Sequence, residues 1–185
     1  MFDVARFVAE CEAGISTGGG RGVVRETLMA AISNPAGIVA VLGEPKRAGV
    51  QILHRSPSLT IVHVAWAPSY TQAPHNHLVW AEIGVYSGRE DNIFWRRLPQ
   101  DAAGRVEAAG AKALCEKDAE PLGRDIIHSV TNPIPRLTAA IHVYGGDFFA
   151  AERSEWDPET LAEQRWDPER AVRRFEEANR TLAAE

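Results

Sequence analysis

The middle of the chain is a series of short β-rich segments, and this series constrains the fold more than any other feature. Each segment is rich in β-branched and aromatic residues and is bounded by Pro, Gly, Asn or Ser, which favour turns. Strands at this spacing are typical of a closed barrel or a two-sheet sandwich. The expected strands are 50–53, 59–66, 78–86, 92–97, 105–108, 111–114, 126–130 and 137–144.

The two ends of the chain have a helical pattern instead. Apolar residues recur at helical spacing within 2–13, 23–32 and 35–42, and again within 159–165 and 168–183. Each of the last two segments follows a Trp-Asp-Pro tripeptide, whose Asp suits the helix cap and whose Pro suits the first helical position. We therefore expect a single domain over 1–185, with N-terminal helices (1–45), a β-barrel (50–148) and C-terminal helices (155–185).

Composition and charge argue against several classes of partner and location. The 185 residues include 20 basic and 25 acidic side chains, a net charge of -5, so nucleic acid and anionic membranes are not expected partners. No segment approaches the roughly 20 apolar residues of a membrane span, and residues 1–14 are too charged for a signal peptide. With only Cys11 and Cys115, a disulfide scaffold is not expected, and we predict a cytoplasmic protein.

Three histidines form the strongest candidate for a chemical site. His75 and His77 lie two residues apart, and in an extended segment such residues point to the same face, as a chelating pair must. His128 lies in a later expected strand. Glu82 has the opposite parity and could join the pair only across a bulge or turn. Taken alone, a surface pair of histidines is the alternative, and His63 is most simply a satisfied core histidine.

These residues also resemble the two motifs of the cupin superfamily. The first motif is matched by His75-Asn76-His77, Glu82 and Gly88, and the second by Pro121-Leu122-Gly123, His128 and Asn132. The spacings before Gly88 and His128 differ slightly from the family pattern, and Ser69 and Cys115 replace two glycines. The resemblance spans about residues 50–148 and implies a double-stranded β-helix, or jelly roll, holding one divalent metal through the three histidines.

Within the cupins, the chain is similar to the cysteine dioxygenase group of thiol dioxygenases. That group also places helices before the barrel and carries a His-x-Tyr strand after the third histidine, matched here by His142-Val143-Tyr144. The resemblance implies Fe(II), a hydrogen-bonded His142–Tyr144 pair beside it, and an arginine for the substrate carboxylate, for which Arg55 is the candidate and His54 the alternative. It also implies O₂ as co-substrate and a small thiol-bearing organic acid as substrate.

Several alternatives stay open at this point. The cysteine dioxygenase group has Cys or Gly where this chain has Glu82, and a His₃Glu site would instead resemble acireductone, flavonol and oxalate-degrading cupins. Imidazole suits several metals, so Zn, Mn or Ni could replace iron in an isomerase, lyase or hydrolase. A non-catalytic ligand binder is the remaining class. We expect no organic cofactor and either a monomer or a homodimer.

Overall fold

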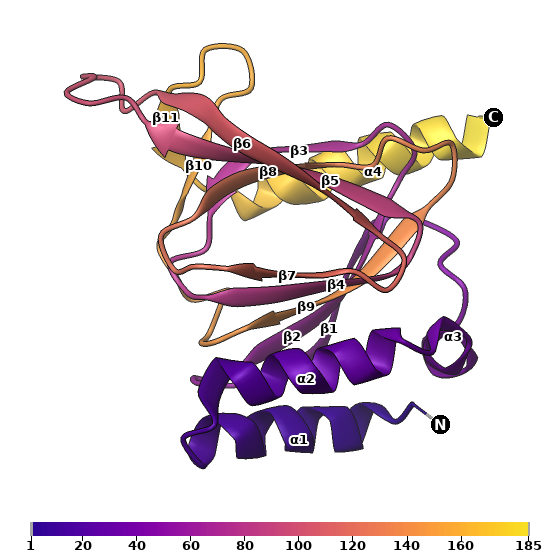
Figure 1. Cartoon of the computed structure of the whole chain (residues 1–185). Helices are drawn as coiled ribbons and strands as arrows, with labels where there is room; N and C mark the ends of the chain where they lie inside the picture. The colour runs from indigo at the N-terminus through magenta and orange to yellow at the C-terminus, as the bar shows by residue number, and fades with distance from the viewer. Residues whose placement is uncertain (1, 185) are drawn as a thin grey trace.

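The computed structural model describes residues 2–184, shown in Figure 1. Three helices come first: α1 (Val4–Ser16), α2 (Gly20–Ile32) and α3 (Pro35–Leu42). The side chain of Asp3 accepts a hydrogen bond from the backbone N–H of Arg6, and that of Asn34 accepts one from Gly37, so each caps the helix that follows it. These helices confirm the prediction for the N-terminal segment.

The strands that follow build two antiparallel sheets. One sheet has the order β1-β2-β9-β4-β7 and the other has the order β11-β10-β3-β8-β5-β6. The sheets face each other as a jelly roll, in agreement with the predicted fold class, but they form a sandwich and do not close into a continuous barrel. The strands are β1 (Gly49–Arg55), β2 (Thr60–Trp66), β3 (Thr71–Asn76), β4 (Ala81–Ser87), β5 (Arg89–Arg97), β6 (Val106–Cys115), β7 (Ala119–Leu122), β8 (Ile127–Thr131), β9 (Thr138–Tyr144), β10 (Ser154–Trp156) and β11 (Glu163–Arg165).

Some of these strands differ from the prediction. The segment expected to be a helix over 159–165 is a turn followed by β11, which pairs with β10. Asp157 caps that turn through the backbone N–H of Thr160, so the first Trp-Asp-Pro starts no helix. The second one does: Asp167 accepts from Glu169, and α4 runs over Pro168–Ala184. The strand β3 was not expected, although it carries His75.

Gly88 lets the chain pass from one sheet to the other. It is the only residue between β4 and β5, which lie in different sheets. Its φ is +89°, and a Cβ on it would lie 2.4 Å from Oγ1 of Thr138. Any larger residue would therefore be strained in its backbone and would collide with β9.

The two faces of the β1-β2-β9-β4-β7 sheet belong to different hydrophobic cores, one between the sheets and one beneath the N-terminal helices. On β4, Ala81, Ile83 and Val85 point into the space between the sheets, whereas Tyr86 belongs to the core beneath the helices. The helices α1 and α2 cover the outer face (Figure 1). Leu28 of α2 packs so closely that a Cβ on Gly84 would lie 2.9 Å from it. Each such fully buried leucine stabilises the layer by about 1.5–3 kcal/mol.

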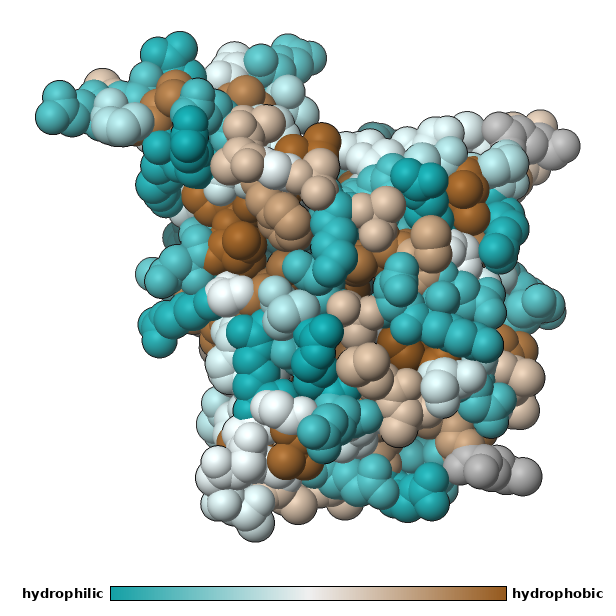
Figure 2. All heavy atoms as spheres, in the orientation of Figure 1, coloured by the Kyte–Doolittle hydropathy of each residue, from teal (hydrophilic) through white to brown (hydrophobic). Residues whose placement is uncertain are grey.

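The face of the molecule drawn in Figure 2 has no single dominant hydrophobic area. Hydrophobic areas there are scattered among hydrophilic ones. Within residues 2–184, no helix has the length and apolar character needed to cross a membrane.

Candidate metal centre

The fold brings the three predicted histidines together. His75 on β3 lies directly opposite His128 on β8 in the sheet register, and His77 follows the end of β3. The Nε2 atom of His77 lies 3.2 Å from Nε2 of His75 and 3.0 Å from Nε2 of His128. All three side chains are buried. The sequence therefore identified these three residues correctly as a cluster that could hold a metal ion.

The protonation states of these imidazoles suit a metal ion. Burial and the nearby Arg153 guanidinium lower the pKa of His75 to about 3, and burial and the neighbouring imidazoles hold the pKa values of His77 and His128 well below their usual range. All three rings are therefore neutral at physiological pH. Neutral imidazole is the form that binds metals.

The nitrogen spacing also fits. His75 can donate its Nδ1–H to the carbonyl oxygen of Ala73 at 2.9 Å, which leaves its Nε2 bare, and His128 is placed in the same way by Asn92. Two nitrogens that bind one ion at about 2.0–2.1 Å each must lie within about 4 Å of each other. The separations of 3.0 and 3.2 Å meet this condition. The donor set therefore fits a divalent transition metal.

Asn92 and Glu90 form a chain of hydrogen bonds that orients the ring of His128. Nδ1 of His128 lies 2.7 Å from Oδ1 of Asn92, and the amide nitrogen of Asn92 donates to Oε1 of Glu90 at 3.2 Å. Because the amide NH₂ is directed at Glu90, the amide oxygen must face His128. This fixes the tautomer with a proton on Nδ1 and a free Nε2, which is how outer hydrogen bonds usually orient metal-binding histidines. The sequence analysis did not identify these two residues.

Glu90 is an ionised carboxylate inside the protein. Burial by itself raises the pKa of Glu90, but His142 and the hydrogen bonds from Trp66 and Asn92 outweigh it and hold the pKa below its usual value. The indole N–H of Trp66 donates to Oε2 at 2.9 Å, and the same oxygen lies 3.4 Å from Nε2 of His142. The carboxylate of Glu90 therefore contacts both Asn92, which orients His128, and His142.

His142 and Tyr144 form the expected pair. Their side chains point into the space between the sheets, and Nδ1 of His142 lies 3.2 Å from the Tyr144 hydroxyl. The Tyr144 ring meets the edge of the His77 ring at a centroid separation of 5.1 Å. Burial raises the pKa of Tyr144, so its hydroxyl stays protonated and can donate a hydrogen bond next to the histidine cluster.

Glu82 does not join the histidines, which corrects the expectation of a fourth ligand. It is on β4 with the parity of Tyr86, on the outer face, where α2 covers it. Nε of Arg21 donates to Oε1 at 2.6 Å, and Nη1 of Arg25 donates to Oε2 at 3.2 Å. The chain bends between His77 and Glu82, where Leu78 has a φ of +58°, and β4 lies in the other sheet with Glu82 on its outer face. The cluster that could hold a metal contains histidines alone among residues 2–184.

Arg55, the predicted anchor of a substrate carboxylate, lies away from the histidine cluster. Arg55 is about half exposed and pairs with Asp147 through two hydrogen bonds of 2.9 and 3.0 Å, and it does not line the cavity beside the histidines. The alternative, His54, points to the helical layer instead, with its Nε2 3.1 Å from Glu12 of α1. Neither residue is in a position to hold a substrate at the histidine cluster.

Arg153 is the cation that the sequence analysis missed. It is only 5% exposed, and its guanidinium lies 3.9 Å from the centroids of both the Phe148 and the Trp166 rings. Burial lowers its pKa to about 10, so it remains charged. Within residues 2–184, its Nη1 has no hydrogen-bond partner. It lies in an irregular segment between β9 and β10, where no periodicity or motif marks it in the sequence.

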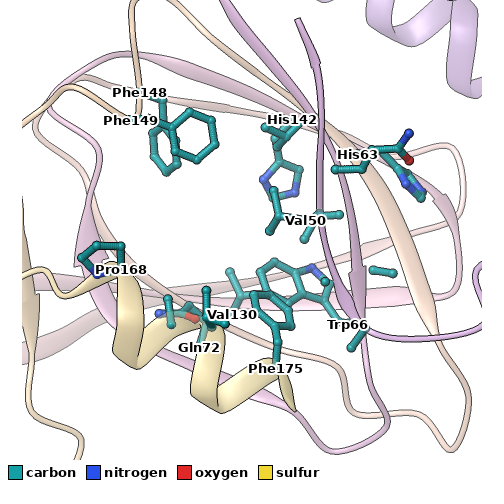
Figure 3. A pocket seen from close by; sticks show the side chains of 18 of the residues that line it. Val50, His63, Trp66, Gln72, Val130, His142, Phe148, Phe149, Pro168 and Phe175 are labelled. Carbon is teal, nitrogen blue, oxygen red and sulfur yellow. The ribbon is translucent and has the colours of Figure 1, made fainter. Parts of the chain in front are cut away.

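A cavity of about 620 Å³ connects these groups. The three histidines, Tyr144 and Arg153 line one part of it, together with His142. Figure 3 shows the ring of His142 directed into the cavity, Phe148 and Phe149 on one side, and Trp66 and Phe175 on another. The volume lies within the range of about 300–1,000 Å³ that is usual for small-molecule sites.

His63 lies beside this cavity and is hydrogen-bonded within the core. Its ring nitrogen Nε2 lies 2.8 Å from the hydroxyl of Tyr86, which belongs to the core under the helices. Burial lowers the pKa of His63, so the ring is neutral there. It is a satisfied core histidine, as its position within a strand predicts.

Known structures resemble the β-sandwich part of the chain. An RmlC-like cupin from Methanocaldococcus jannaschii matches with 10% identity and a TM-score of 0.47 over 57% of this chain and 86% of its own. A protein from Bacillus halodurans matches with 17% identity and a TM-score of 0.47 over 55% and 72%. A cupin superfamily protein from Desulfitobacterium hafniense matches with 12% identity and a TM-score of 0.44 over 56% and 82%.

Two of these three structural neighbours are cupins. No protein-family model matches the sequence. Because the identities and TM-scores are this low, the likenesses say nothing about the metal or substrate of this chain. Its chemistry follows from the residues of the cavity.

Proposed function

We propose that this protein is an Fe(II)-dependent dioxygenase of a thiol-bearing organic acid. The observation that carries the proposal is the arrangement of three neutral imidazoles, a protonated tyrosine and an unpaired guanidinium around one cavity. The overall reaction would convert R–SH and O₂ into the sulfinic acid R–SO₂H, so that both oxygen atoms enter the product.

The metal would be held by Nε2 of His75, His77 and His128. A bound Fe(II) would supply the redox chemistry with O₂ and would favour the thiolate form of the substrate. Three neutral ligands leave the full charge of the ion uncompensated, which suits an anionic substrate. The choice of iron rests on the resemblance to thiol dioxygenases, since imidazole also suits Zn and Ni.

Arg153 would bind the carboxylate of the substrate. A guanidinium offers paired N–H donors that match a carboxylate, and such charge-assisted bonds are strong in a buried site. The rings of Phe148 and Trp166 hold the group in place from both sides. The role that the sequence analysis gave to Arg55 thus passes to Arg153.

Tyr144 would donate a hydrogen bond to the reacting end of the substrate or to O₂. Its hydroxyl lies 3.2 Å from Nδ1 of His142, and Nε2 of His142 lies 3.4 Å from the carboxylate of Glu90. His142 and the hydrogen bonds from Trp66 and Asn92 lower the pKa of Glu90, so a negative charge lies next to this pair. These residues would therefore orient the phenol without exchanging a proton with solvent.

The test is oxygen consumption by protein purified without a histidine tag and loaded anaerobically with Fe(II). A panel of mercapto-acids should give thiol-dependent O₂ uptake and sulfinate, and replacing Arg153 with Met should raise KM more than it lowers kcat. Zinc- or manganese-dependent turnover of a non-thiol substrate without O₂ would replace the proposal with Lewis-acid chemistry. Ligand binding without turnover under any of these conditions would identify a binding protein.

A further inference from the structure

The cavity continues beyond the histidine cluster, and its part under α4 is mostly apolar. Val62 and Val64 of β2 and Val130 of β8 line it from the two sheets. The helix α4 closes it from outside with Ala171 and Phe175. Figure 3 shows Phe175 extending from this helix toward Trp66 and Val130. The cavity is therefore polar at the metal-binding end and mostly apolar under α4, where the amide of Gln72 is the polar group beside Val130.

The helix α4 is anchored as a fixed wall of this apolar chamber. The carboxylate of Glu155 is fully buried and pairs with Arg170 and Arg174 of the helix. Near its other end, Asn179 exchanges two hydrogen bonds with the backbone of Ala48, at 2.7 and 2.9 Å. Phe175 stacks on Tyr70 with a centroid separation of 5.0 Å. These contacts fix the position of α4 over the chamber.

The volume exceeds what a very small acid needs. A cavity of about 620 Å³ lies within the range of about 300–1,000 Å³ in which drug-sized ligands bind. A three-carbon mercapto-acid bound between Arg153 and the histidines would leave the chamber under α4 filled with water against valine and phenylalanine side chains. Covering those apolar walls with an apolar group is favourable by about 25 cal/mol per Å².

We propose that the ligand of this cavity is an amphipathic monoanion: an organic acid whose carboxylate meets Arg153 and whose apolar chain or ring fills the chamber under α4. The assignment of the reactive end rests on the proposed function, but the binding mode does not require turnover. It differs from the prediction of a small acid, because the body of the ligand, as well as its charged end, is recognised.

The test is calorimetric binding of unbranched monocarboxylates, from acetate to octanoate, to the intact zinc-loaded protein. Each buried methylene is worth about a fourfold gain in affinity, so affinity should climb along the series until the chamber is full. An affinity that stays flat from butyrate to octanoate would overturn the proposal. Loss of O₂-dependent activity in the iron-loaded protein would not, because this measurement uses a redox-inert metal.

Two pairs of variants locate the two ends of the ligand. Ala171→Phe places a ring in the chamber and should shorten the chain length at which affinity stops rising, whereas Ala183→Phe, the same change on an exposed part of α4, should not. Arg153→Met should weaken all chain lengths by about tenfold or more. Its control is Arg47→Met, which removes an exposed arginine at the rim of the same cavity. If Arg47→Met weakened binding and Arg153→Met did not, the proposed orientation would be wrong.

Discussion

Two buried glutamates on consecutive strands have different partners. Glu82 on β4 is 1% exposed and faces α2, where Arg21 and Arg25 donate to it. Glu90 on β5 is fully buried and faces the cavity side, where Trp66, Asn92 and His142 surround it. The region around Glu82 joins a helix to the sheet, and the region around Glu90 supports the histidine cluster.

The comparison shows that the side chains around a buried carboxylate determine which other groups its charge affects. Glu82 is neutralised by two permanent cations, so its charge is confined to the interface between helix and sheet. Glu90 is stabilised mainly by N–H donors that belong to residues touching the histidine cluster or Tyr144. Its charge can therefore influence the metal ligands and the phenol, which the charge of Glu82 cannot do.

The largest effect is expected from removing a histidine on the cavity side. His128→Ala removes one of three donors and should weaken metal binding well beyond the about 100-fold upper range for loss of a supporting hydrogen bond. Competition with a chromophoric chelator measures this. Retention of wild-type affinity would show that the cluster does not bind the ion through His128.

Glu82→Ala tests the helix side of the comparison. It leaves Arg21 and Arg25 without their partner; because both arginines are about one-third exposed, the expected cost in the free energy of unfolding is below the about 3 kcal/mol of a fully buried pair. Urea unfolding of the metal-free protein should show this loss, while metal affinity stays unchanged. A drop in metal affinity with unchanged stability would reverse the assignment of Glu82.

Asn92→Ala should act mainly on metal affinity. It removes the group that fixes the tautomer of His128, and outer hydrogen bonds of this kind are worth about 10–100-fold in affinity. The matched control is Asn179→Ala, which loses hydrogen bonds to Ala48 and touches no histidine of the cluster. Equal losses of metal affinity in both variants would indicate general loosening instead of a specific support.

Acid should destabilise the metal-free protein through the same cluster. Because the pKa of His75 is lowered from about 6.5 to about 3, the unfolded chain binds more protons between these values. The free energy of unfolding should therefore fall as the pH decreases through this window, by up to about 1.4 kcal/mol per pH unit for each such histidine. In His75→Ala, the slope measured by urea unfolding should be shallower, and an unchanged slope would contradict the lowered pKa.

The smallest effect is expected at Arg55. Its pair with Asp147 is largely exposed, and such pairs contribute about 0–1 kcal/mol to stability. Arg55→Ala should therefore leave carboxylate affinity unchanged and should lower stability by no more than that amount. A substantial loss of carboxylate affinity would return the anchoring role from Arg153 to Arg55.

The histidine cluster could be predicted because its spacing is local. His75 and His77 share a face through the two-residue period of a strand, and His128 lies in a segment whose turn and strand character are plain. The direction of Glu82 could not be predicted in this way, because the chain bends at Leu78 and crosses to the other sheet before β4. The family motif alone would have placed it among the ligands.

Other parts of the site depend on contacts that the sequence does not reveal. Arg153 lies in an irregular segment and packs between the rings of Phe148 and Trp166, so no periodicity marks it. Asn92 and Glu90 lie in an expected strand or its flanking turn, but their roles arise only when β5 pairs with β8 beside His128. Residues 163–165 form the strand β11 because β10 offers an edge to pair with, which overrides the helical pattern of 159–165.

The central claim is that His75, His77 and His128 together hold one metal ion and that Glu82 does not. The most direct test is the metal content, by mass spectrometry, of three proteins purified without a histidine tag: the wild type, Glu82→Gln, and a double variant with His75→Ala and His77→Ala. We predict near-stoichiometric metal in the first two and almost none in the third. Metal retained by the double variant, or lost from Glu82→Gln, would contradict the account.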